Sequence, residues 1–280
     1  MTDFHLPKKS IDTQNGKIFY WLGNSFPGRP FVILLHGLSS NHTTWLSTIN
    51  VLHANHYNSL APDLRGHGFS DKTKQRDLYA LNVFSRDLQE ILVAEQIKNF
   101  VLIGYSFGGQ VAVDFTARYQ GCAKGLILIS TNIAPPLKYL KLNFFTSIVV
   151  AGLNFLAMLL FWQKRRNYHY YEHGRAVGYW DSVWDGLRTM PLAVNLWLLA
   201  QAFKADLRNA IKQIKIPATL FYGQNDAYIA KKEINDTAKA LPQAQLIISK
   251  NQGHFIGTNS QAETARIILN FLKNCENSDF

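Results

Sequence analysis

Short apolar runs alternate with segments of helical period along most of the chain. The runs that resemble buried strands occupy residues 17–22, 31–37, 59–64, 99–105, 125–130, 218–223 and 244–249. Between them, apolar positions recur with helical spacing at 42–54, 82–96 and 108–119. Strands that alternate with helices of about a dozen residues are typical of βαβ units. The pattern therefore predicts an α/β fold with a mostly parallel sheet and helices on both faces.

This alternation breaks between residues 132 and 205. After Pro135-Pro136 the chain has no strand-like run and is rich in Leu, Phe, Trp and Tyr, which predicts a helical insertion after a sheet strand. We therefore predict a core formed by residues 1–131 and 206–280, with residues 132–205 as a helical cap.

The most apolar part of the insertion is long enough to cross a membrane. Residues 142–162 carry no charge and would measure about 31 Å as one helix. A single crossing would place the strands at 125–130 and 218–223 on opposite sides of the bilayer, although both belong to the predicted sheet. We therefore expect two apolar cap helices, divided near Gly152 and Asn154.

The composition fits one large domain with its own core. Of the 280 residues, 47% are hydrophobic and 13% are aromatic, so no disulfide or metal is needed to stabilise the chain. Cys122 and Cys275 have neither metal-binding nor redox spacing. The first ten residues lack the apolar core of a signal peptide, which favours a cytoplasmic location. The net charge of +10 comes without a recognisable nucleic-acid module, so we expect no nucleic-acid partner.

Ser106 is the first candidate for chemistry. It stands in G-Y-S-F-G, residues 104–108, between a predicted strand and a predicted helix. This sequence fits G-x-S-x-G, in which glycines permit a sharp strand-to-helix turn that exposes the serine hydroxyl. The N–H of Phe107 at the helix start would then be free to bind an oxyanion. A glycine-rich turn whose serine merely caps the helix is the alternative, and the strand before and helix after favour the nucleophile.

A base and an acid for this serine are found on later loops. A serine hydroxyl needs a base to take its proton, and functional residues of such sheets lie at the carboxyl ends of strands. His254 follows the predicted strand 244–249, and Asp226 follows the predicted strand 218–223. We therefore predict a triad in the chain order Ser106, Asp226, His254. The alternatives are a solvated loop histidine and an aspartate that caps the next helix.

Several further motifs occur together with the serine turn. The chain has H-G-L at 36–38, P-D-L-R-G-H-G-F-S-D at 62–71, and the late loops G-Q-N-D and Q-G-H-F. With these motifs it resembles the α/β-hydrolases of the serine esterase and lipase type, such as monoacylglycerol lipases, over nearly all its length outside the insertion. The resemblance implies a sheet of the eight-stranded kind found in that family and a helical cap. It also implies that Leu38 is the second oxyanion donor beside Phe107. Related dehalogenases and epoxide hydrolases carry Asp where this chain has Ser106.

Other residues near these motifs are assigned to the pocket or to the loops. We expect the substrate pocket to be lined by His36, Gly37, Trp45 and Tyr105, together with aromatic residues of the cap. The stretch that holds Asp63, Arg65 and His67 shapes the rim of the site in the family. We therefore interpret these three residues as loop structure and not as catalysts.

The apolar insertion indicates a cleft for apolar substrates, a surface that docks on lipid, or both. The alternative is that its helices are apolar only because they pack on the core. Basic residues that could attract anionic lipid head groups flank the run: Lys138, Lys141, Lys164, Arg165 and Arg166. They could equally be solvated helix ends. His169 and His173 have a spacing that could hold a metal, but no third ligand is in register, so we expect no metal.

These features predict a serine hydrolase that cleaves carboxylic esters with apolar acyl groups, with monoacylglycerol-like lipids first. The implied acyl-enzyme mechanism needs no cofactor, and the expected location is cytoplasmic, peripheral to a membrane. Because fold does not determine substrate, a C–C bond hydrolase, a lactonase or a perhydrolase is the alternative within the same chemistry. A small-molecule receptor with low turnover is the alternative from another class.

Overall fold

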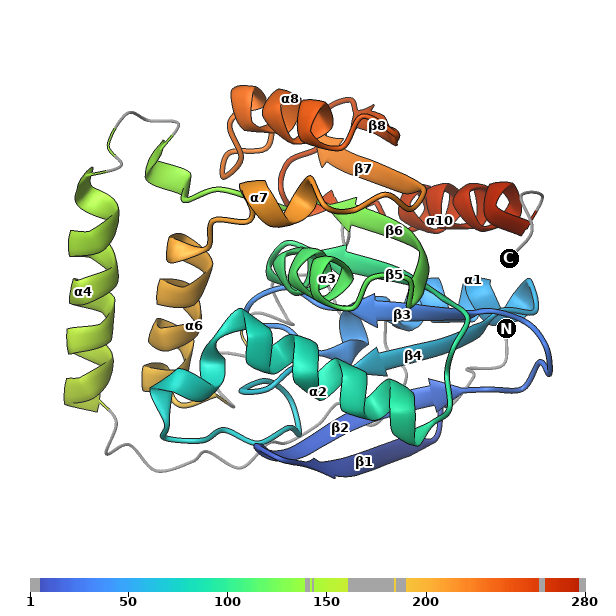
Figure 1. Cartoon of the computed structure of the whole chain (residues 1–280), viewed down its shortest axis with the longest axis horizontal. Helices are drawn as coiled ribbons and strands as arrows, with labels where there is room; N and C mark the ends of the chain where they lie inside the picture. The colour runs from blue at the N-terminus through green and yellow to red at the C-terminus, as the bar shows by residue number, and fades with distance from the viewer. Residues whose placement is uncertain are drawn as a thin grey trace.

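One eight-stranded sheet organises the molecule. The computed structural model describes residues 6–138, 142, 144–160, 184, 190–256 and 260–276. The strands are β1 (Lys8–Thr13), β2 (Gly16–Gly23), β3 (Phe31–Leu35), β4 (Asn58–Pro62), β5 (Phe100–Tyr105), β6 (Ala123–Ile129), β7 (Ala218–Gly223) and β8 (Ala244–Ser249). Their order is β1-β2-β4-β3-β5-β6-β7-β8, and only the β1–β2 and β2–β4 pairs are antiparallel. The predicted α/β fold with a mostly parallel sheet is confirmed (Figure 1).

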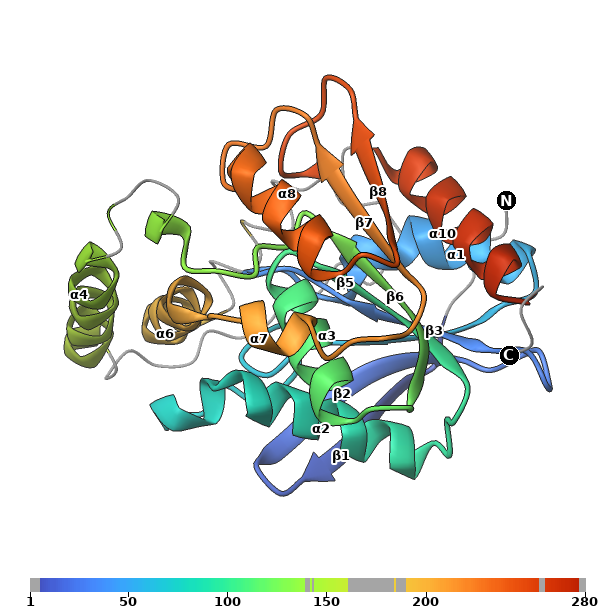
Figure 2. The same cartoon turned by 45° about the horizontal axis from the view of Figure 1, so that its top comes forward.

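Helices cover both faces of this sheet. They are α1 (Leu46–Ala54), α2 (Leu81–Ala94), α3 (Phe107–Arg118), α4 (Phe144–Leu160), α6 (Leu192–Lys204), α7 (Arg208–Ile211), α8 (Lys231–Ala240) and α10 (Gln261–Glu276), with the short 3-10 helices η1 (His42–Trp45), η2 (Arg76–Tyr79) and η3 (Pro136–Lys138). Figure 2 shows α2, α3, α7 and α8 on one face and α1 and α10 on the other. The core is accordingly divided by the sheet into two apolar layers.

The central strands are apolar throughout because both of their faces are covered. In β5, Leu102 enters the layer beneath α2 and α3, whereas Val101 and Ile103 enter the layer beneath α1 and α10. Successive side chains of a strand point to opposite faces, so a strand buried on both sides reads as a continuous apolar run. The edge strand β1, K-K-S-I-D-T, is mostly exposed. It has no such run, and the sequence pattern did not predict it.

Between β6 and β7 the described residues are largely helical. The expected division of the apolar run at Gly152 and Asn154 was wrong, because α4 is one continuous helix of 17 residues. A single glycine inside a helix costs only about 1 kcal/mol. The neighbouring Leu, Ala and Met residues favour helix, and α4 packs along α6. Figures 1 and 2 both show α6 between α4 and the sheet.

The outer face of α4 exposes large apolar side chains. Those at least 45% exposed are Phe144, Phe145, Ile148, Phe155, Leu156, Met158 and Leu159. Among the helices that the structure describes, none combines the length and apolar character needed to cross a membrane. Of the basic residues predicted to flank this run, Lys141, Lys164, Arg165, Arg166 and the side chain of Lys138 lie outside the described residues.

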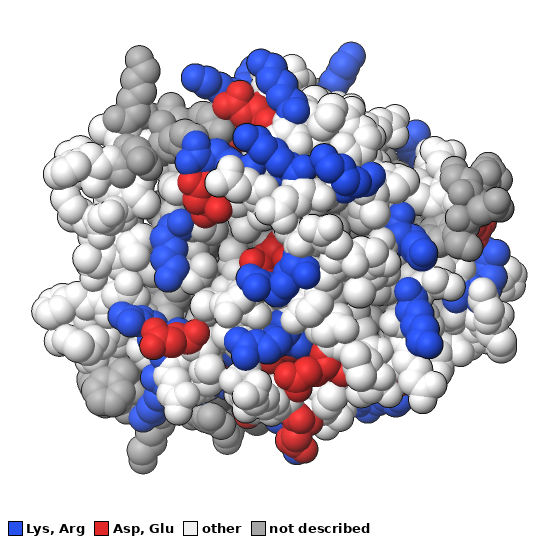
Figure 3. Space-filling model, in the orientation of Figure 1, with Lys and Arg blue, Asp and Glu red and all other residues white. Residues whose placement is uncertain are grey.

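The basic charge of the chain is spread out on the face seen in Figure 3. Lys and Arg side chains lie interspersed with Asp and Glu, while the surface over α4 carries neither sign. On this face the net charge of +10 therefore does not form one continuous basic patch.

The start of α3 crosses the end of β3 so closely that only glycine fits. A Cβ added to Gly108 would lie 2.5 Å from the carbonyl oxygen of His36 and would also overlap that of Leu35. In contrast, a Cβ on Gly152 in α4 would meet nothing within 4 Å. Packing therefore requires glycine at position 108, whereas position 152 has room for a larger side chain.

We expect Gly108→Ala to destabilise the protein and Gly152→Ala to stabilise it. Overpacking against backbone atoms costs about 1–3 kcal/mol, whereas alanine in an open helical position gains about 0.5–1 kcal/mol over glycine. Thermal unfolding measures both, at roughly 2–4 °C per kcal/mol for a chain of this size. Equal shifts of Tm for the two variants would contradict the close crossing of α3 and β3.

Candidate active site

Ser106 occupies a strained turn at the carboxyl end of β5. Its φ is 51° and its ψ is −114°, a conformation that is rare for a residue with a Cβ. The turn is closed by hydrogen bonds from the amides of Gly109 and Gln110 to the carbonyl oxygen of Ser106, at 2.9 and 3.2 Å. Gly104 permits the turn, since a Cβ there would come within 2.5 Å of the carbonyl oxygen of Gly108. Strain of this kind persists only where the surroundings enforce it.

The structure brings Ser106, His254 and Asp226 into one hydrogen-bonded chain. The distance from Ser106 Oγ to His254 Nε2 is 3.0 Å. On the other side of the ring, His254 Nδ1 lies 2.9 Å from Asp226 Oδ2 and 3.2 Å from Oδ1. Ser106 follows β5, Asp226 follows β7 and His254 follows β8. Because these strands are parallel, the three residues lie at the same edge of the sheet. These are the contacts expected for a nucleophile, its base and the group that orients the base.

Asp226 and His254 are shielded from solvent to different degrees. The Asp226 side chain is 1% exposed, and its Oδ1 accepts hydrogen bonds from the amides of Tyr228 (2.8 Å) and Ile229 (3.0 Å). The His254 side chain is 12% exposed and lies beside the rings of Tyr228 and Phe255. The carboxylate is thus fixed by backbone donors, while the imidazole keeps access to the cavity.

Leu38 and Phe107, the two residues predicted to supply oxyanion donors, lie at the same cavity. Leu38, after β3, and Phe107, the first residue of α3, both line the cavity next to Ser106. In the part of the chain that the structure describes, neither amide has a hydrogen-bond acceptor. Free N–H groups beside a nucleophile are the elements of an oxyanion hole.

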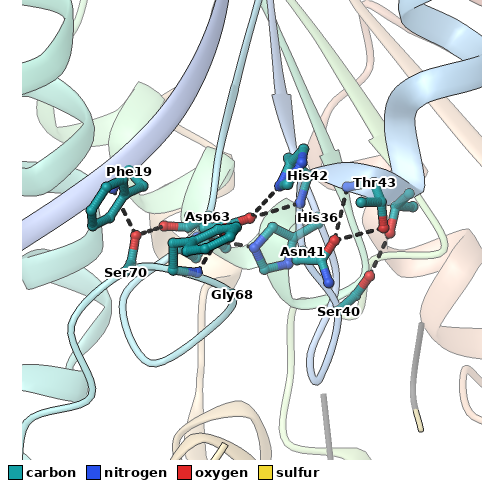
Figure 4. Close-up of polar contacts among 12 residues, drawn as sticks. Phe19, His36, Ser40, Asn41, His42, Thr43, Asp63, Gly68 and Ser70 are labelled. Carbon is teal, nitrogen blue, oxygen red and sulfur yellow. Dashed lines mark hydrogen bonds and ion pairs between the residues drawn. The ribbon is translucent and has the colours of Figure 1, made fainter. Parts of the chain in front are cut away.

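Buried polar contacts hold the loop that carries Leu38. The side chain of Asp63 accepts hydrogen bonds from the amide of His42 (2.9 Å) and from its ring Nδ1 (2.8 Å) on one side, and from the amide of Phe69 (2.8 Å) on the other. Figure 4 shows Asp63 between His42 and the turn at Gly68, with His36 nearby. Asp63 and His42 are fully buried. The interpretation of Asp63 as loop structure agrees with these contacts.

Two further histidines of this loop region are kept neutral. His36 Nε2 accepts from the amide of Leu64 at 2.9 Å, and its Nδ1 donates to the carbonyl oxygen of Gly37 at 2.8 Å. Burial lowers the pKa of His36 to about 4. Burial and, secondarily, His36 lower the pKa of His67 to about 3. Their lone pairs therefore remain available as hydrogen-bond acceptors near pH 7.

An apolar cavity of about 310 Å³ opens beside Ser106. Gly37 and Tyr105, both predicted pocket residues, line it. The prediction was wrong for His36 and Trp45. His36 is fully buried in the loop contacts described above, and Trp45 is fully buried in the apolar layer beneath α1 and α10.

Aromatic residues of 132–205 were expected at the pocket, and Phe203 of α6 is one of them; the rest of the cavity wall was not predicted. This part of the wall includes Asn132 and Pro136 after β6, Leu199 and Ala202 of α6, and Tyr228, Ile229 and Phe255 of the late loops. Tyr228, Ile229 and Phe255 had a signal, since they lie within three residues of Asp226 or His254. Leu199 and Ala202 of α6 had none, because their place depends on how the segment between β6 and β7 folds back over the sheet.

Among the described residues, no three or more His, Cys, Asp or Glu side chains are grouped so that they could hold a metal ion. His169 and His173, whose spacing alone would allow a metal, lie outside the described residues.

Comparison with known proteins shows the family to which the chain belongs. Residues 30–258 match the model of the alpha/beta hydrolase fold family, and the chain therefore belongs to that family. It is 26% identical to Lipase 1 of Psychrobacter immobilis over 268 residues, which cover 92% of this chain and 81% of that protein.

Solved structures show the same fold. An esterase from Exiguobacterium antarcticum superposes with a TM-score of 0.74 at 17% identity, covering 95% of this chain and 100% of the esterase. An enol-lactonase from Burkholderia xenovorans LB400 also gives a TM-score of 0.74, at 19% identity and the same coverage.

We expect the free energy of unfolding to fall as the pH is lowered from 7 to 5. The pKa values of His36 and His67 in the folded protein lie below the unfolded value near 6.5, so the unfolded chain binds protons first. The loss should reach about 2 kcal/mol per histidine at pH 5, where Asp63 does not yet titrate. Urea unfolding at both pH values measures it. His67→Gln should reduce the pH dependence, whereas the same substitution at the exposed His56 should not.

Proposed function

We propose that this protein is a serine hydrolase that cleaves carboxylic esters with apolar acyl groups through an acyl-enzyme. One observation carries the proposal: the hydrogen-bonded chain from Ser106 through His254 to Asp226 ends at the wall of an apolar cavity. Nucleophile, base and orienting acid have the mutual geometry that acyl transfer requires. Two free backbone amides stand beside the nucleophile.

In the first half of the proposed reaction, Ser106 Oγ attacks the ester carbonyl carbon while His254 Nε2 takes the hydroxyl proton. The carbonyl oxygen becomes an oxyanion that accepts hydrogen bonds from the amides of Leu38 and Phe107. Removal of one such donor typically costs about 3 kcal/mol of transition-state stabilisation. Asp226 keeps the Nδ1 proton in place and stabilises the imidazolium. His254 then gives its proton to the leaving alcohol, and the acyl group stays on Ser106.

In the second half, a water molecule gives a proton to His254 Nε2 and attacks the acyl carbon. The second tetrahedral intermediate uses the same two amides. It collapses as the proton returns from His254 to Ser106 Oγ, and the carboxylic acid leaves. No cofactor takes part in these steps.

The lining of the cavity supports an apolar acyl group. Leu199, Ala202 and Phe203 of α6 line it together with Ile229 and Phe255. Its volume of about 310 Å³ lies at the small end of the roughly 300–1,000 Å³ of ligand pockets. This size favours an acyl chain of short to medium length over a long one. The similarity to a lipase and an esterase supports an ester substrate, while the lactonase neighbour supports the alternative of a cyclic ester. Contact of the cap with a lipid surface stays a prediction.

The first test is hydrolysis of p-nitrophenyl esters with acyl chains of two to sixteen carbons. We expect the highest kcat/KM at medium length, and we expect Ser106→Ala to lower kcat by at least about 10⁴-fold because the nucleophile is lost. If kcat/KM is highest for the two-carbon ester, Ser106 remains the proposed nucleophile, but the proposed preference for apolar acyl groups is wrong. Absence of Ser106-dependent turnover on every ester would contradict the proposal and favour a lactone, a C–C substrate or a receptor.

Leu199→Trp should shift the acyl preference toward shorter chains. The larger ring would occupy part of the cavity without touching the hydrogen bonds of Ser106. We expect kcat/KM for the eight-carbon ester to fall about tenfold or more, while the two-carbon ester changes by less than about threefold. The ratio of the two kcat/KM values measures the shift, and an unchanged ratio would mean that the acyl chain lies elsewhere.

A further inference from the structure

Ser39, which follows the proposed oxyanion donor Leu38, has an unusual backbone conformation. Its φ is 55°, in the left-handed region that residues with a Cβ seldom adopt. Such a residue keeps this conformation only where neighbouring groups hold it, and such positions cluster at active sites. The peptide unit that ends at the Ser39 N–H begins at the Leu38 carbonyl, and the Leu38 N–H belongs to the unit just before it. Fixing Ser39 therefore restricts how far the Leu38 amide can rotate.

Two buried side chains bind Ser39, one at its backbone amide and the other at its hydroxyl. Its amide donates to His67 Nε2 at 3.2 Å, and its hydroxyl donates to Asn195 Oδ1 at 2.9 Å. His67 Nδ1 donates to the carbonyl oxygen of Arg65 at 3.0 Å, and its lowered pKa keeps Nε2 unprotonated as an acceptor. The turn is therefore fixed by side chains 28 and 156 residues away in the chain.

Asn195 lies in the first turn of α6 and is only 8% exposed. Its Oδ1 binds Ser39, while its Nδ2 finds no partner among the described residues. A buried donor without a partner is costly. An apolar side chain at this position would avoid the cost but could not bind the Ser39 hydroxyl. Among the described residues, the contact with Ser39 is thus the one hydrogen bond that the Asn195 side chain makes.

The same helix also contacts the segment that carries the other oxyanion amide. Gln110 Nε2, in the first turn of α3, lies 3.3 Å from the carbonyl oxygen of Ala202 in α6. Phe107, the proposed second donor, begins α3. One cap helix therefore connects to both halves of the oxyanion hole, through Ser39 and through Gln110.

We propose that Ser39 and Asn195 are positioning residues through which α6 holds the Leu38 amide in its catalytic orientation. In this proposal α6 is a fixed part of the oxyanion hole and not a detachable lid. The inference rests on the proposed function, since it takes the Leu38 N–H as an oxyanion donor.

The kinetic test compares Asn195→Ala, Ser39→Ala and the double variant on a medium-chain p-nitrophenyl ester. We expect each single variant to lower kcat about tenfold with KM changed by less than about twofold, because the contact matters for the transition state. The double variant should resemble the singles, since both remove the same hydrogen bond. Gln201→Ala is the matched control, because Gln201 lies on the same helix with 9% exposure but lines a separate surface depression near Arg76.

A transition-state analogue distinguishes positioning from a general loss of stability. A trifluoromethyl ketone forms a tetrahedral adduct with the serine and places an oxyanion between the two amides. We expect its Ki to rise by the same factor by which kcat/KM falls. A lower Tm with unchanged kcat and Ki would overturn the proposal, and so would an equal effect of Gln201→Ala.

Amide hydrogen exchange tests the positioning of the loop directly and does not depend on whether the protein hydrolyses esters. The amides of Ser39, His42 and Thr43 are hydrogen-bonded in the loop and should be protected. In Asn195→Ala, the peptide that contains them should exchange faster, whereas a peptide from the centre of α3 should not change. This readout needs no turnover. Unchanged exchange of the loop would overturn the proposal even if Ser106-dependent hydrolysis is found.

Discussion

The close approach of α3 to the ends of β3 and β5 is the contact on which the rest of the site depends. Gly104 and Gly108 have no Cβ, so the helix begins directly against the strands and Ser106 is forced to a φ of 51°. The strain of such a residue is of order 1–3 kcal/mol, and it is borne by a region in which every residue of β5 is buried. The rigid sheet therefore presents the hydroxyl at a defined point.

Parallel pairing then determines where the partners of Ser106 can lie. Because β5, β6, β7 and β8 run in the same direction, the loops after them emerge at one edge. Asp226 and His254 come from neighbouring strands, and their ring-to-carboxylate contact of 2.9 Å needs no long excursion of either loop. On the other side of the serine, the loop after β3 is held by Asp63, whose burial is compensated by hydrogen bonds from His42 and Phe69.

Much of this arrangement was predictable because its signals are local. The succession of strands and helices along the core, the turn at Ser106 and the loops of Asp226 and His254 each depend on a few adjacent residues. What could not be predicted depends on contacts between distant segments. Trp45 was expected in the pocket, but the helical turn that carries it directs the ring into the core beneath α1. The continuity of α4 through Gly152 depends partly on packing of the whole helix along α6, which sequence periodicity does not reveal.

Helix α6 has two tasks in the proposed mechanism. Its residues Leu199, Ala202 and Phe203 form part of the cavity wall, and Asn195 on the same helix binds the turn next to Leu38. A shift of α6 that widened the cavity would also move Asn195, since a helix moves as a unit. Under the proposed mechanism, the size of the acyl group and the geometry of the oxyanion hole are therefore coupled. A substrate that fits the cavity leaves the Leu38 amide in place, whereas one that displaces α6 reacts more slowly even when it binds.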